Sequence, residues 1–132
     1  MNIVNNILNF FNLYLLQNKK LIYYLLQNIK DCIPKEYMEK YALQIDCINK
    51  IQWVLNIEVD LYFEENKLCK DYKIKEWERE KIIAKAVIVD KNDKIYRFVF
   101  YAVNGRIFSI ESNLPFRDLL VENIKDLQIF CE

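Results

Sequence analysis

The chain of 132 residues contains no histidine and a single glycine, Gly105. Without histidine, nucleophilic sites of the Ser-His or Cys-His type have no base. One glycine cannot form either of the glycine-rich motifs that hold phosphates in nucleotide-binding proteins. These absences exclude the commonest hydrolase triads and glycine-rich nucleotide sites, so we expect no catalytic residues and no cofactor.

The chain also lacks an excess of charge of either sign. Lys and Arg together number 19, as do Asp and Glu, so the formal net charge is zero. Proteins that bind nucleic acid or anionic membranes through general attraction are usually basic. We therefore predict neither a nucleic-acid partner nor a membrane partner.

No charged residue occurs in the first 18 positions, which are rich in Ile, Leu and Phe. A signal peptide would begin with basic residues, and the five asparagines among the first twelve positions are too polar for a membrane span. The asparagines follow one side of a helix, which predicts a first helix with a broad apolar surface. Burial within its own domain, or dimerisation, could cover that surface.

The four cysteines lie at positions 32, 47, 69 and 131. They form no C-x-x-C pair and there is no histidine to complete a zinc site, so we predict no metal. A chain with 53% hydrophobic residues does not need disulfides to form a core. We expect reduced thiols and a cytoplasmic location.

Helical periodicity follows the first segment. An apolar stripe of Leu21, Leu25 and Ile29 predicts a helix over residues 19–31. Pro34 suits the first turn of another helix over 34–44. Near the end of the chain, Pro115 and a stripe of four apolar residues predict a C-terminal helix over 114–128; the stripe comprises Phe116, Leu120, Ile124 and Leu127.

Between these helices the pattern favours strands. Residues 52–64 alternate strictly between apolar and more polar positions, which predicts one long, half-buried strand. Residues 81–90, 95–103 and 106–112 predict three more, with a tight turn at Asn104-Gly105. Residues 72–80 favour a strand, and a helical turn is the alternative.

Together these expectations give an α+β fold in a single domain over residues 1–132. About three N-terminal helices should pack on one face of a four-stranded antiparallel meander, followed by the C-terminal helix. The helical part would occupy 1–46, the sheet 51–112 and the last helix 114–128.

The Asn104-Gly105 turn has consequences for the faces of its two strands. A two-residue loop pairs Val103 with Arg106 and places Val99 and Tyr101 on the same face, which we assign to the core. The opposite face is a mixture of apolar and polar residues that the C-terminal helix or another chain could cover. Its apolar members are Phe98, Phe100 and Ile107.

Acidic residues gather on the polar face of residues 52–64. Glu58, Asp60 and Glu64 alternate along it, and Glu65 follows. Such carboxylates can form a solvated face paired with lysines, an acidic strip that binds a partner, or a catalytic or metal site. The predicted partner-binding residues are Glu58, Asp60, Tyr62, Glu64, Glu65, Phe98, Phe100 and Ile107.

Two short stretches suggest a family. "IPKEYMEKY" at 33–41, behind N-terminal helices, and "NGRIFSIE" at 104–111, late in an antiparallel sheet, resemble the small cytoplasmic immunity proteins that neutralise bacterial polymorphic and contact-dependent toxins. The resemblance implies a non-enzymatic protein that binds and occludes a cognate toxin. An acidic strip and many tyrosines would suit a basic nuclease as that toxin.

Two alternatives remain open from the sequence. The first is a self-associating structural or accessory protein of a phage or mobile element, in which apolar surfaces are buried across a homodimer. The more remote one is a carboxylate-dependent hydrolase.

Overall fold

The computed structural model describes residues 18–63 and 72–132. Residues 18–28 are helical and continue into a 3-10 turn, η1 (Ile29–Cys32). A second turn, η2 (Lys35–Tyr37), leads into α2 (Met38–Asp46). These correspond to the helices expected at 19–31 and 34–44. The helix expected before them lies outside the described residues.

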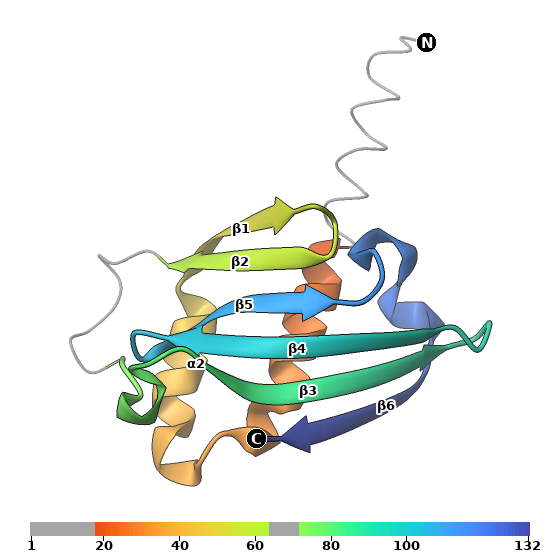
Figure 1. Ribbon diagram of the computed structural model, residues 1–132. Coiled ribbons are helices and arrows are strands. Elements are labelled where there is room, and N and C mark those ends of the chain that lie inside the picture. Colours follow the sequence, from red (N-terminus) through yellow and green to blue (C-terminus); the bar gives the residue numbers. More distant parts are fainter. Residues whose placement is uncertain (1–17, 64–71) are drawn as a thin grey trace, which may run out of the picture.

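A six-stranded antiparallel sheet forms the second layer (Figure 1). Its strands are β1 (Ile48–Val54), β2 (Glu58–Phe63), β3 (Lys81–Asp90), β4 (Ile95–Val103), β5 (Arg106–Ser112) and β6 (Ile124–Cys131). The order across the sheet is β1-β2-β5-β4-β3-β6, so β1 and β6 are its edges. The fold is α+β, but the prediction of three helices, four strands and a C-terminal helix is wrong.

The long strand predicted at 52–64 is a hairpin. β1 ends at Val54, three residues turn the chain, and β2 begins at Glu58. Because this loop has an odd number of residues, paired positions such as Trp53 and Val59 have the same parity. The alternation of apolar and polar residues therefore continues through the turn unbroken and imitates a single strand.

The segment predicted as the C-terminal helix is mostly extended. Two short turns, η5 (Phe116–Asp118) and η6 (Val121–Asn123), precede β6, which pairs with β3. The helical stripe ends at Leu127. From there apolar residues recur at every second position, at Ile129 and Cys131, as they do in a strand. Pairing with the otherwise open edge of β3 stabilises the extended form, because each such pair satisfies backbone groups on both strands.

Residues 72–80 contain a helical turn in place of the favoured strand. The turn is η4 (Lys75–Trp77), and its Trp77 is buried in the core. The strands expected at 81–90, 95–103 and 106–112 are confirmed as β3, β4 and β5.

The turn between β4 and β5 is the expected two-residue loop, with Asn104 and Gly105 both at positive φ. A β-bulge follows it: Ala102 pairs with Ile107, but Tyr101 pairs with Ser109. From there on the register is shifted by one residue from the predicted one. Val99 therefore lies opposite Glu111.

The core lies between the sheet and the two helices, which stand behind the sheet in Figure 1. The β4 residues that face the helices are Tyr96, Phe98, Phe100 and Ala102. For β4, our assignment of the core face was therefore reversed. The larger aromatic side chains fill the space under the helices, and the face that includes Arg97, where the charge can stay hydrated, is left open.

A buried glutamine of α2 ties three segments together. The Gln44 amide nitrogen donates hydrogen bonds to the carbonyl oxygens of Tyr72 (2.7 Å) and Gly105 (3.0 Å). Its oxygen accepts a hydrogen bond from the backbone N–H of Ile107 (3.2 Å). The β4–β5 turn is thereby fixed to the helical layer.

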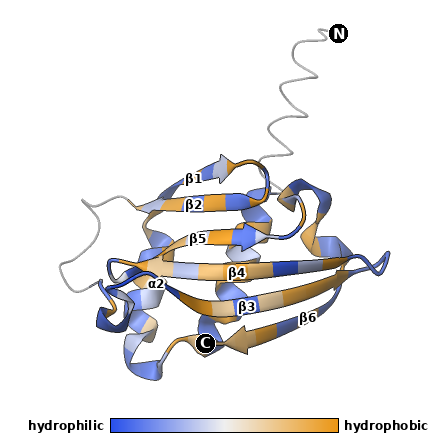
Figure 2. Cartoon of the chain, in the orientation of Figure 1, coloured by the Kyte–Doolittle hydropathy of each residue, from blue (hydrophilic) through white to orange (hydrophobic). Residues whose placement is uncertain are grey.

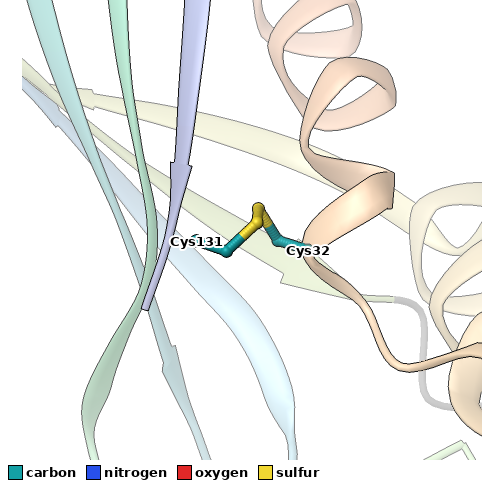
Figure 3. Close-up of a disulfide and its surroundings, with 2 residues drawn as sticks. All are labelled: Cys32 and Cys131. Carbon is teal, nitrogen blue, oxygen red and sulfur yellow. A yellow bond between two sulfur atoms is a disulfide. The ribbon is translucent and has the colours of Figure 1, made fainter.

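A disulfide joins Cys32 at the end of η1 to Cys131 at the end of β6 (Figure 3). The expectation of four reduced thiols is wrong for this pair. The two positions are 99 residues apart, and only the pairing of β6 with β3 brings them together. Cys47 is a free, buried thiol, and Cys69 lies outside the described residues.

Within the described part of the chain, no helix is both long and apolar enough to cross a membrane.

Candidate protein-binding face

The face of the sheet opposite the helices is here named the open face; it is turned towards the viewer in Figure 1. Strand pairing aligns its side chains in rows that cross the sheet. One row contains Val54, Glu58, Glu111, Val99, Lys85 and Phe130. The next contains Gln52, Asp60, Ser109, Tyr101 and Ile82.

Three carboxylates on β2 and β5 form what we name the acidic cluster: Glu58, Asp60 and Glu111. Glu58 lies directly opposite Glu111, a like-charge pair that destabilises a sheet. Burial, together with the charges of Asp60 and Glu111, raises the pKa of Glu58. Among the described residues, no ion pair involves any of the three.

A tyrosine on β4 contributes the nearest hydrogen bond. The Tyr101 hydroxyl donates to Oε2 of Glu111 at 3.0 Å. Partial burial and this hydrogen bond raise the pKa of Tyr101, so the phenol remains protonated at neutral pH. Tyr101 therefore adds a hydrogen-bond donor to the acidic cluster and no charge.

The structure places the predicted partner-binding residues in three groups. Glu58, Asp60 and Tyr62 lie on the open face. Glu64 and Glu65 lie outside the described residues. The third group, Phe98, Phe100 and Ile107, is at most 1% exposed and belongs to the core, so it offers no surface to a partner.

Glu111 was not among the predicted partner-binding residues. The expected register places it opposite Phe98, on the mixed face of the hairpin that is turned away from the predicted core, and does not place it beside Glu58. The bulge moves it opposite Val99 and beside Glu58. A bulge has no reliable signal in a single sequence, because it depends on how the neighbouring strands twist.

The part of the open face formed by β4, β3 and β6 carries exposed and half-buried apolar residues. Figure 2 shows β3 and β4 as mostly hydrophobic along their length. Ile95 and Phe130 are 42% and 49% exposed. Lys85 and Arg97 interrupt this area with exposed positive charges. Its half-buried apolar members are Ile82, Val87, Val89, Val99 and Val103. Partly exposed apolar side chains with charged ones among them are suited to contact with another protein.

Two hollows lie near the edge strand β1. One of about 250 Å³ surrounds the β1–β2 turn and is lined by Val54, Leu55, Ile57, Glu58, Glu111 and Ser112. The other, of about 220 Å³, lies between the helical residues 18–28 and β1 and includes Lys19, Tyr23, Lys50 and Trp53. The first hollow adjoins the acidic cluster.

The chemistry of the open face is that of a charged and apolar contact surface. Among the described residues, no group of three or more Asp, Glu, Cys or His side chains could hold a metal ion. The carboxylates of the acidic cluster are positioned to attract a positively charged group.

Comparison of the chain with protein-family models, with curated proteins and with solved structures finds no match.

Proposed function

We propose that this chain is a non-enzymatic protein-binding module that occludes a cognate toxin through its open face. The observation that supports this most is the acidic cluster. The chain retains three carboxylates next to one another, including a directly facing pair, at a cost to its own stability. Groups kept at such a cost are often used in binding.

The shape and composition of the open face favour a protein as the partner. Sites for small molecules are usually concave and enclosed, whereas a six-stranded sheet face is broad. Half-buried apolar side chains, together with Tyr62 and Tyr101, provide contact area. A basic partner surface would complement the acidic cluster and associate faster for that reason.

The expectation that the partner is a toxin depends on the resemblance to immunity proteins. The C-terminal helix that was part of the expected order of elements is replaced by η5, η6 and β6. The resemblance therefore depends on the stretches at 33–41 and 104–111.

The expected cytoplasmic location depended on reduced cysteines. Because disulfides persist mainly in oxidising compartments, the bond between Cys32 and Cys131 favours such a compartment instead.

The direct test is to mix the purified chain with the toxin domain encoded beside its gene and to measure the toxin's activity. An equimolar amount of the chain should abolish that activity, and the chain alone should show none. Full toxin activity in the presence of excess chain would overturn the proposal. Light scattering on the chain alone tests the self-associating alternative, which requires a dimer.

The part played by the acidic cluster is tested with the double variant Glu58→Gln, Glu111→Gln. Its association rate with the toxin should fall by about tenfold, because electrostatic attraction mainly accelerates association. The variant should be at least as stable as the wild type, since it removes a like-charge pair. Glu122→Gln, at an exposed position on η6, is the matched control and should leave the rate unchanged.

A further inference from the structure

The turn between β1 and β2 carries the most exposed large apolar side chain of the described residues. Leu55 is 84% exposed, and Ile57, two positions later, is 41% exposed. We name residues 55–57 the exposed turn. An isolated exposed leucine is ordinary on a protein surface, so the backbone and the neighbours of this one decide its meaning.

The backbone of Leu55 is in the left-handed region. Five described residues have positive φ, and four of them are of the types that tolerate it: Asn56, Asp93, Asn104 and Gly105. Leu55, with φ of 53°, is the exception. Its Cβ is crowded in this conformation, and a side chain that is 84% exposed has little packing to offset the cost.

The exposed turn is also braced from behind. The carbonyl oxygen of Asn56 accepts a hydrogen bond from the N–H of Phe116 (3.0 Å), and that of Ile57 accepts one from Ser112 (2.7 Å). Phe116 is itself buried in the core. Leu55 is therefore presented on a fixed turn, which lowers the entropy that is lost when it is bound.

The two charged residues that line the hollow beside the turn are both acidic. The hollow of about 250 Å³ beside Leu55 is lined in part by Glu58 and Glu111. Apolar walls with carboxylates at one side suit the aliphatic stem and the cationic head of a Lys or Arg side chain. Charge complementarity thus favours a basic protein surface as the occupant.

We propose that Leu55 is the anchor of the interface: it inserts into an apolar pocket on the partner protein, and a Lys or Arg at the rim of that pocket enters the hollow beside Glu58 and Glu111. This inference rests on the proposed function and adds the chemistry of the partner's surface. Burial of the Leu55 side chain in the complex offsets the free-energy cost of its left-handed backbone conformation.

The test uses three variants of the full chain with the same toxin domain. Leu55→Asn removes the apolar side chain and places a residue that tolerates positive φ at the same site. Its melting temperature should rise by about 3 °C, while its affinity for the toxin should fall by at least about tenfold. Asn56→Gly relaxes the same turn, leaves Leu55 in place, and should change the affinity less than about twofold.

The outcomes separate this inference from the proposed function. If Leu55→Asn melts below the wild type, Leu55 supports the fold and the inference is wrong. If the wild type inhibits the toxin and Leu55→Asn inhibits it equally well, the inference fails and the proposed function stands. If the wild type does not bind the toxin at all, both fail. Leu55→Met, which keeps an apolar side chain, should bind as the wild type does.

Discussion

Replacing Gln44 by alanine should destabilise the fold more than most single substitutions. Gln44 is completely buried and makes three hydrogen bonds, to Tyr72, Gly105 and Ile107. Its removal leaves the N–H of Ile107 inside the core, where an unsatisfied donor costs about 1–3 kcal/mol. Losing the two bonds donated by the amide and leaving a small cavity bring the expected loss to about 4 kcal/mol.

The loss is measurable by urea denaturation, followed through the fluorescence of buried Trp77. For a chain of this size, a loss of that magnitude should lower the unfolding midpoint by about 2 M, with little change in the slope. Gln27→Ala, at an exposed helical position, is the matched control and should shift the midpoint only slightly. If Gln44→Ala and Gln27→Ala cannot be distinguished, the reasoning about Gln44 is refuted.

A second substitution separates hydrogen bonding from shape. Glutamate at position 44 keeps the volume of the side chain but presents an oxygen to two carbonyl oxygens. The buried carboxyl must then be protonated, so its pKa in the folded state lies above the unfolded value. The stability of Gln44→Glu relative to the wild type should be highest below the pKa of this carboxyl in the unfolded state, near pH 4. It should fall as the pH rises through the pKa in the folded state.

Three further results are expected. Gly105→Ala should lower the free energy of unfolding by about 2 kcal/mol in urea denaturation. The φ angle of Gly105 is +81°, and the added Cβ would lie 2.7 Å from the Cβ of Lys73. Glu76→Gln should move the pKa of Tyr37 from about 12 towards 10 in an alkaline absorbance titration, because the hydrogen bond to Glu76 is the main cause of the increase. In the wild type this contribution to stability is complete below pH 10 and is lost as the pH rises towards 12. Cys32→Ser with Cys131→Ser should lower the melting temperature, since opening a loop closed across 99 positions gives up about 4 kcal/mol of entropic stabilisation.

Each of these three has its own control. Asn104→Gly lies at the adjacent positive φ and should be nearly neutral, so an equal loss there would contradict the reasoning about Gly105. Glu122→Gln should leave the pKa of Tyr37 where it is. Dithiothreitol should lower the melting temperature of the wild type but leave that of the double serine variant unchanged. If dithiothreitol leaves the melting temperature of the wild type unchanged, the disulfide does not stabilise the fold.

Periodicity located strands more reliably than it located their ends. β3, β4 and β5 were predicted closely because each has a strong pattern bounded by turn residues. The hairpin of β1 and β2 was missed because neither Leu55 nor Ile57 signals a turn, and the alternation survives a three-residue loop. Leu55 occupies a conformation that sequence propensities assign to other residue types.

The candidate site was predicted in part. Glu58, Asp60 and Tyr62 lie on one face because alternation along a strand fixes their direction. Phe98 and Phe100 were assigned to the wrong face because both faces of β4 carry apolar residues. Arg97 was the available signal: it shares a face with Val99 and Tyr101, and a charged side chain favours the exposed one.

The sequence by itself determined the α+β class, three of the strands, the Asn104-Gly105 turn and the exclusion of histidine-dependent chemistry. These depend on residue types and local spacing. The tertiary structure decided the bulge that brings Glu111 to Glu58, the pairing of β6 with β3 and the disulfide between Cys32 and Cys131. Each of these joins segments distant in the chain, and their stability comes from packing and backbone pairing that no local pattern records.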